Sequence, residues 1–125
     1  MKEIIKSEAA PNPIGPYSHA VKAGNFIFLS GQVGVNPSTG ELIKDDIKKE
    51  ATQVMENLKS VLQAANADFS KVVKTSIFLS DMSLFADVNE VYGSYFQGNY
   101  PARETVAVKT LPRNANVEIS MIVMI

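Results

Sequence analysis

Residues 117–125 form the segment that most constrains the fold of this chain. They read Val-Glu-Ile-Ser-Met-Ile-Val-Met-Ile, a run rich in β-branched side chains that predicts a strand. Alternate positions from Val117 are all apolar, while Ile122 and Met124 share the opposite face with Glu118 and Ser120. A strand that is apolar on both faces needs cover on both sides. We therefore expect helices on one face of its sheet and a second copy of the chain on the other.

Two helices are predicted from the spacing of apolar side chains. In residues 47–65 these side chains recur at steps of three and four, and Asp45 or Asp46 can cap the first turn. The apolar stripe consists of Ile47, Ala51, Val54, Met55, Leu58, Val61, Leu62 and Ala65. A second helix is expected from about residue 84 to residue 96, where Pro101 prevents its continuation further along.

The remaining segments predict strands around these helices. Residues 20–23 and 26–33 flank the dipeptide Gly24-Asn25, which is typical of a tight hairpin. Residues 72–79 and 105–108 are further strands, and residues 41–43 are a candidate edge strand. The order β-β-(β)-α-β-α-β-β predicts an α+β sandwich, with two helices on one face of a mixed sheet. At 125 residues, we expect one domain, spanning 1–125.

Two charged residues near the end of the chain are candidates for a functional site. Arg103 follows Tyr100-Pro101-Ala102 at the mouth of a strand, and its planar guanidinium matches a carboxylate edge to edge. Glu118 lies in an apolar strand, where desolvation can raise a carboxyl pKa towards the range useful for proton transfer. The alternative is a solvated arginine and a strand glutamate that faces water. The first interpretation predicts a pocket that binds a small carboxylic acid and moves a proton beside it.

Composition excludes several other chemistries. The chain has no cysteine and one histidine, which leaves no thiolate nucleophile, Cys-ligated metal or multi-histidine metal site. We interpret His19 as a loop histidine that is hydrogen-bonded near Tyr17. A formal net charge of −1 argues against broad attraction to nucleic acid or to an acidic membrane. No apolar run has the length of a signal sequence or a membrane span, so we expect a cytoplasmic location.

Five sequence blocks, in order across nearly the whole chain, resemble the signature blocks of the RidA family, also called the YjgF family. They are Ile14-Gly15-Pro16-Tyr17-Ser18, Leu29-Ser30-Gly31-Gln32, Val88-Asn89-Glu90-Val91-Tyr92, Tyr100-Pro101-Ala102-Arg103 and Leu111-Pro112 with Val117-Glu118-Ile119. The resemblance implies a chorismate-mutase-like α+β fold and a homotrimer with three clefts between protomers. It also implies hydrolysis of reactive 2-imino acids, such as 2-iminobutanoate and 2-iminopropanoate, and of their enamine tautomers. The products are 2-oxo acids and ammonia, no metal or cofactor takes part, and the reaction prevents damage to other enzymes.

The resemblance also implies roles for individual residues. Arg103 would clamp the substrate carboxylate, Glu118 would activate the hydrolytic water, and Tyr17 would contribute its hydroxyl. The residues expected to line or adjoin the pocket are Ser30, the Gly31 backbone, Asn89 and Thr105. Three positions depart from the family pattern: Glu104 beside Arg103, Thr105 in place of a common cysteine, and Ser120 in place of a second acid. Strand alternation places Glu104 on the face opposite Arg103 and Thr105.

Two other functions are compatible with the same pocket between subunits. One is a regulatory protein that binds a metabolite through Arg103 and signals to a partner. The other is an RNA-directed role, as a translation inhibitor or endoribonuclease, which the family's labels suggest and the charge of −1 disfavours. The presence of both Arg103 and Glu118 favours the deaminase, because a pure carboxylate binder does not need the buried acid.

Overall fold

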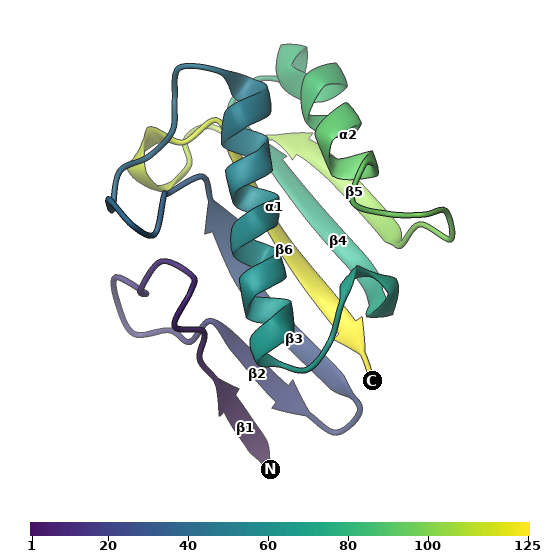
Figure 1. Cartoon of the computed structure of the whole chain (residues 1–125). Coiled ribbons are helices and arrows are strands. Elements are labelled where there is room, and N and C mark those ends of the chain that lie inside the picture. Colours follow the sequence, from purple (N-terminus) through teal and green to yellow (C-terminus); the bar gives the residue numbers. More distant parts are fainter.

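Two α-helices lie on one face of a six-stranded sheet in the computed structural model, which describes all residues from 1 to 125 (Figure 1). The helices are α1, Ile47–Ala64, and α2, Phe85–Gly93. The strands are β1, Lys2–Ile5; β2, Ala20–Ala23; β3, Phe26–Val33; β4, Val72–Leu79; β5, Ala102–Ala107; and β6, Val117–Met124. The sheet order is β1-β2-β3-β6-β4-β5, and only the pair β4–β5 is parallel. The predicted α+β class, with two helices on one face of a mixed sheet, is confirmed.

Four boundaries differ from the expectations. β1 was not predicted, because two of its four residues are charged and a segment so short carries little periodicity. Residues 41–43 form no strand, and only an isolated bridge joins Val35 to Leu42. The second helix ends at Gly93 because the next turns close on three-residue hydrogen bonds, including Phe96 N–H to Gly93 O at 3.2 Å. β5 begins at Ala102, so Arg103 lies inside the strand rather than before it.

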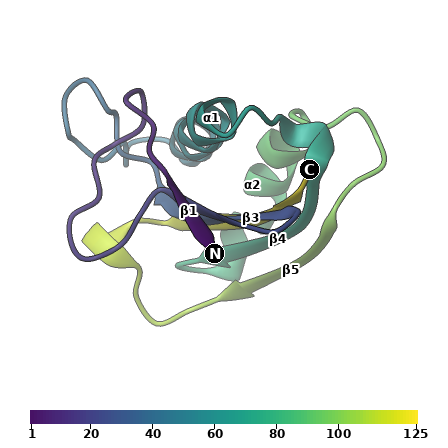
Figure 2. The same ribbon diagram turned by 90° about the horizontal axis from the view of Figure 1, so that it is seen from below.

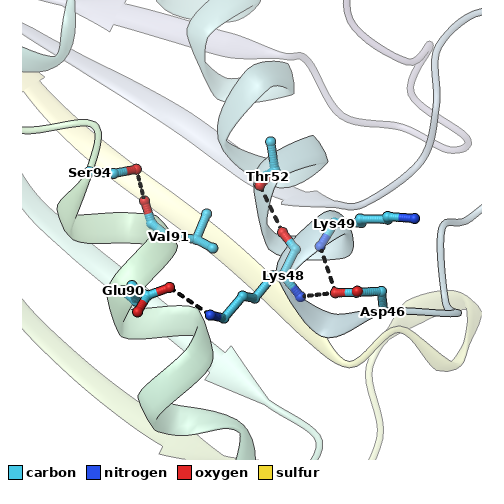
Figure 3. A network of polar contacts seen from close by, with 7 residues as sticks. All are labelled: Asp46, Lys48, Lys49, Thr52, Glu90, Val91 and Ser94. Carbon is cyan, nitrogen blue, oxygen red and sulfur yellow. Dashed lines mark hydrogen bonds and ion pairs between the residues drawn. The ribbon is translucent and has the colours of Figure 1, made fainter.

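Helix α1 begins where its cap was expected. One carboxylate oxygen of Asp46 accepts from the backbone N–H groups of Lys48 and Lys49, at 2.8 and 3.2 Å (Figure 3). The Lys48 side chain then reaches across to α2, where its Nζ lies 2.7 Å from Glu90 Oε2. The apolar stripe of α1 packs into the single hydrophobic core, which lies between the helices and the sheet. Capping and amphipathic spacing together therefore determine where this helix starts and which side it buries.

A buried glutamate on α1 holds the start of β6. Glu50 is fully buried, and its carboxylate accepts from the backbone N–H of Asn116 at 2.7 Å and from its side-chain amide at 3.0 Å. Gly34 permits this approach, because a Cβ there would lie 2.8 Å from the backbone oxygen of Glu50. The contact anchors the loop that immediately precedes Glu118.

The other face of the sheet is not covered by either helix. Figure 2 shows both helices on one side of the strands. On the opposite side, Phe26, Phe28, Val106 and Met124 are between 41% and 49% exposed, which is high for large apolar side chains of a sheet. We call this surface the open face. It agrees with the expected pattern of the last strand, while the homotrimer stays a prediction.

Candidate active site

Arg103 is held by helix α2 on the helical side of the sheet. Its Nη1 donates to Asn89 Oδ1 at 2.7 Å, and its guanidinium carbon lies 5.1 Å from the ring centroid of Tyr92 and 5.7 Å from that of Phe85. The Tyr92 ring is itself fixed, because its hydroxyl donates to Thr75 Oγ1 at 3.1 Å. One edge of the guanidinium, Nε and Nη2, is left without a protein partner. Cation–π contact and a fixed amide thus orient a fork that suits a carboxylate.

A cleft surrounds this arginine, and we call it the arginine cleft. It is lined by Asn89, Glu90, Tyr92, Gly93, Tyr100, Pro101 and Arg103. Burial raises the pKa of Tyr92 above its ordinary value, so this ring stays neutral beside the guanidinium. Asn89 is therefore both a wall of the cleft and the residue that orients Arg103.

Glu118 lies on the opposite side of the sheet from Arg103. Its neighbours in β6, Val117 and Ile119, are fully buried under the helices, so alternation turns the Glu118 side chain towards the open face. Burial raises the pKa of its carboxyl, and no hydrogen bond or ion pair offsets that desolvation. The raised pKa agrees with the expectation for an acid among apolar neighbours, while a role for Glu118 in proton transfer stays a prediction.

Gly31 makes room for this carboxylate. A Cβ at residue 31 would lie 2.6 Å from Glu118 Oε2. The register between β3 and β6 shifts between Leu29 and Gln32, which places Ser30 and Gly31 in an irregular part of the strand. Bulges of this kind re-aim side chains next to functional sites. A glycine inside a strand pattern is a signal for such a close approach, and it was available in the sequence.

A pocket of about 780 Å³ opens beside Glu118, and we call it the glutamate pocket. Four of the residues that were expected to share a pocket line it: Tyr17, Ser30, Gly31 and Glu118. Ser30 Oγ donates to Ser18 O at 2.6 Å, which ties the Tyr17 loop to β3. Arg113 also lines the pocket, and sequence reasoning did not single it out.

Thr105, which was expected to line the pocket, lines neither cavity of the single chain. Thr105 follows Arg103 on the same side of β5, and its Oγ1 is buried without a hydrogen-bond partner. Glu104 faces the other way, as alternation predicted: it accepts from Ser76 and pairs with Lys74 at 2.9 Å, and these contacts lower its pKa. Glu104 therefore does not compete for Arg103.

His19 is buried and makes two hydrogen bonds, but not to Tyr17. Its Nδ1 accepts from the Ser7 backbone N–H at 3.0 Å, and Nε2 donates to Pro11 O at 2.7 Å. Both ring nitrogens are thus occupied in fastening the 7–11 segment. No group of three or more His, Cys, Asp or Glu side chains is placed to hold a metal ion. No helix is long and apolar enough to cross a membrane.

One protomer does not bring Arg103 and Glu118 together. They lie on opposite faces of the sheet, on strands β5 and β6, with β4 between them. A site that uses both groups requires the arginine cleft of one copy to face the glutamate pocket of another. The structure therefore has two separate cavities, the arginine cleft with Arg103 and the glutamate pocket with Glu118, which we call the half-sites.

Solved structures share this fold over the full chain. RidA from the Antarctic bacterium Psychrobacter superimposes with a TM-score of 0.94 at 41% identity, covering 98% of this chain and 99% of that one. The structure of E. coli TdcF with bound serine gives 0.94 at 38% identity, with 98% of each chain covered. The shared fold and the identity to RidA thus define a small α+β protein of the Rid class.

Sequence comparisons give the family itself. The Endoribonuclease L-PSP family matches residues 7–125. A RutC family protein of Pyrococcus horikoshii is 50% identical over 98% of this chain and 97% of its own length. The mouse 2-iminobutanoate/2-iminopropanoate deaminase is 47% identical over 98% and 90%. This chain belongs to the Endoribonuclease L-PSP family, which includes the RidA proteins, as its sequence blocks predicted.

Proposed function

We propose that this protein hydrolyses reactive 2-imino acids, and their enamine tautomers, to 2-oxo acids and ammonia. The substrates we propose are 2-iminobutanoate and 2-iminopropanoate. The observation that carries the proposal is Glu118, a half-buried carboxyl with a raised pKa that borders an open pocket and has no counter-ion. A group that only binds a carboxylate has no use for such an acid, whereas hydrolysis of an imine needs one.

The proposed reaction uses Arg103 of one copy and Glu118 of another. Nε and Nη2 of Arg103 would hold the substrate carboxylate and so orient C2. Glu118 would take a proton from water as the water oxygen bonds to C2, and the electron pair of the C=N bond would move to nitrogen. Glu118 would then return the proton to that nitrogen. Ammonia then leaves with the electron pair of the C–N bond as the hydroxyl on C2 becomes the carbonyl of the 2-oxo acid; Glu118 takes the proton of that hydroxyl and passes it to the ammonia.

Neighbouring residues would assist these steps. An enamine must first be protonated on carbon, and Glu118 or the Tyr17 hydroxyl would supply that proton. Ser30 keeps the Tyr17 loop in place through Ser18, and Gly31 leaves space for the carboxylate. The free hydroxyl of Thr105 lies on the Arg103 side, where it would hydrogen-bond to water or substrate. A homotrimer that pairs the two half-sites would contain three such clefts.

Relatives support the choice of substrate class. The mouse relative and one from the mite Dermatophagoides farinae, at 47% and 48% identity, are both named 2-iminobutanoate/2-iminopropanoate deaminase. Serine, which is bound in the TdcF structure, carries the same α-carboxylate that Arg103 would clamp. The endoribonuclease description of the family has less support in this chain. Its one histidine uses both ring nitrogens for structure, and the net charge is −1.

An assay with freshly generated imine tests the proposal. A threonine dehydratase would supply 2-iminobutanoate continuously, and an amino-acid oxidase acting on alanine would supply 2-iminopropanoate. We expect this protein to accelerate the release of ammonia beyond the spontaneous rate. If release is not accelerated while 2-oxobutanoate still binds, the metabolite-binding regulator replaces the deaminase.

A further inference from the structure

A second arginine, Arg113, faces the glutamate pocket from the loop between β5 and β6. Its backbone is left-handed, with φ 60° and ψ 20°, and the next residue, Asn114, has φ 55°. Residues other than glycine rarely adopt this conformation, and such outliers concentrate at functional sites. Arg113 Nη2 donates to Gly40 O at 3.0 Å, which ties the loop to the turn that follows β3. The guanidinium is therefore held at the wall of the pocket.

This guanidinium has no anionic partner within the protein. The ion pairs of the structure are Lys6–Glu8, Lys48–Glu90 and Lys74–Glu104, and none involves Arg113. Its only hydrogen bond is to the Gly40 carbonyl, so Nε and Nη1 remain available. Nη2 has a second N–H, so one edge of the guanidinium, Nη1 with Nη2 or Nε with Nη2, can still bind a carboxylate through two hydrogen bonds.

The pocket is also electrically asymmetric. Among its lining residues, Arg113 is the only arginine or lysine and Glu118 is the only carboxylate, while His19 uses both ring nitrogens for hydrogen bonds within the protein. The wall carries apolar groups as well, from Val35, Pro37 and Pro112. This lining matches a ligand that has a polar C=N group beside Glu118, a carboxylate beside Arg113, and methylene groups between the two.

The volume of the pocket exceeds what the proposed three- and four-carbon substrates need. At about 780 Å³ it lies within the range of roughly 300–1,000 Å³ typical of sites for much larger small molecules. A short aliphatic side chain beside Glu118 would leave the Arg113 side of the pocket to water. A side chain that ends in a carboxylate would fill it.

We propose that Arg113 forms a subsite for a terminal carboxylate on the substrate side chain, so that the protein also takes dicarboxylic 2-imino acids of four or five carbons. The proposal rests on the proposed function for the reaction at C2. In such a complex Arg103 of one copy binds the α-carboxylate, while Glu118 and Arg113 of another meet C2 and the distal carboxylate. The specificity for side-chain length and charge is then set by one residue outside the acid–base machinery.

Two variants separate the charge of Arg113 from the shape of its loop. Arg113→Asn removes the guanidinium while keeping a residue type that tolerates left-handed backbone. Arg113→Lys keeps a positive charge but loses the fork. The control is Lys59→Gln, which removes one charge from an exposed position on α1 that does not line the pocket. Thermal melting of each variant verifies that the fold is retained.

The kinetic experiment compares 2-iminoglutarate, made in situ by glutamate oxidase, with 2-iminobutanoate. We measure the ratio of kcat/KM for the two substrates. Loss of one charged hydrogen-bond partner should lower this ratio about 10-fold in Arg113→Asn, mainly through KM for 2-iminoglutarate. Arg113→Lys should fall between that variant and the wild type, and Lys59→Gln should keep the wild-type ratio. A ratio unchanged in Arg113→Asn overturns the subsite.

A binding experiment distinguishes failure of the subsite from failure of the deaminase. Calorimetry with 2-oxoglutarate and 2-oxobutanoate needs no turnover. We expect wild-type protein to prefer 2-oxoglutarate and Arg113→Asn to lose that preference. If neither imine is hydrolysed but the preference still depends on Arg113, the deaminase is wrong and the subsite stands. If both oxo acids bind the wild type equally, or Arg113→Asn weakens both equally, the subsite is wrong.

Discussion

Replacing Gly31 with alanine should separate activity from stability. The new Cβ would lie 2.6 Å from Oε2, 2.9 Å from Cδ and 3.0 Å from Cγ of Glu118. The atoms that it meets all belong to one flexible side chain, which borders a pocket with room to receive it. Gly31 does not have a positive φ, so alanine imposes no backbone strain. The carboxylate moves and the strand stays.

The size of the displacement sets the expected loss. An ordinary carbon–oxygen contact is about 3.3–3.6 Å, so the carboxylate oxygen must retreat by roughly 1 Å. A misplacement of about 1 Å in a reacting group can cost on the order of 100-fold in rate. The cost in stability is that of one off-rotamer side chain, about 1 kcal/mol, and alanine offsets part of it by restricting the unfolded chain.

The matched comparison is Gly34→Ala, where the new Cβ would meet the backbone oxygen of Glu50 at 2.8 Å. That atom belongs to α1 and cannot retreat alone, so this variant should lose about 1–3 kcal/mol of unfolding free energy, as overpacked sites do. We would measure kcat/KM for 2-iminobutanoate and urea unfolding on both variants. Full activity in Gly31→Ala, or equal destabilisation of the two, would refute the assignment of Gly31 as the residue that makes room for a working carboxylate.

Four further outcomes test the site and its assembly. Arg103→Ala should abolish acceleration of imine hydrolysis while the protein stays folded, and Arg103→Lys should not restore the bidentate contact; activity within a factor of two of the parent would contradict the clamp. Glu118→Gln should bind 2-oxobutanoate with little change while turnover falls by about 10²–10⁴, and parallel loss of both would make Glu118 a binding group. Because the folded pKa of Glu118 is raised, the folded state binds more protons than the unfolded state; the unfolding free energy should therefore decline as pH rises above the ordinary glutamate range, and Glu118→Gln should lack this decline. Light scattering should show a trimer in dilute solution at neutral pH, and a stable, active monomer would be incompatible with half-sites that must meet.

The elements with strong periodicity were predictable from the sequence. The stripe of α1 and the largely apolar runs of β4 and β6 each extend over eight or more residues, so the local sequence pattern is long enough to indicate the element. β1 offers only four residues, and its place is determined by pairing with β2, which is a tertiary contact. The end of α2 was missed for a related reason, because apolar spacing continues through the turns after Gly93.

The candidate site was predictable in its chemistry and less so in its geometry. An acid among apolar neighbours predicts a raised pKa, and Glu118 has one. Strand alternation predicts that Arg103 and Glu104 point to opposite sides of the sheet. It does not predict which of the two faces a helix, since that depends on how the edge strand β5 pairs with β4. The left-handed backbone of Arg113 has no signal in residue type, since arginine is not favoured there.

Because Arg103 and Glu118 lie on opposite faces of the sheet, any reaction that needs both groups requires at least two copies of the chain. No single chain can offer the two to one molecule of substrate, whatever its conformation. The rate per chain would then depend on protein concentration, and would fall on dilution as contacts between copies dissociate. Each copy would also serve two neighbours at once, giving its arginine to one cleft and its acid to another. A substitution on the open face that prevents contact between copies would therefore abolish this activity as completely as the loss of Glu118, even far from either cavity.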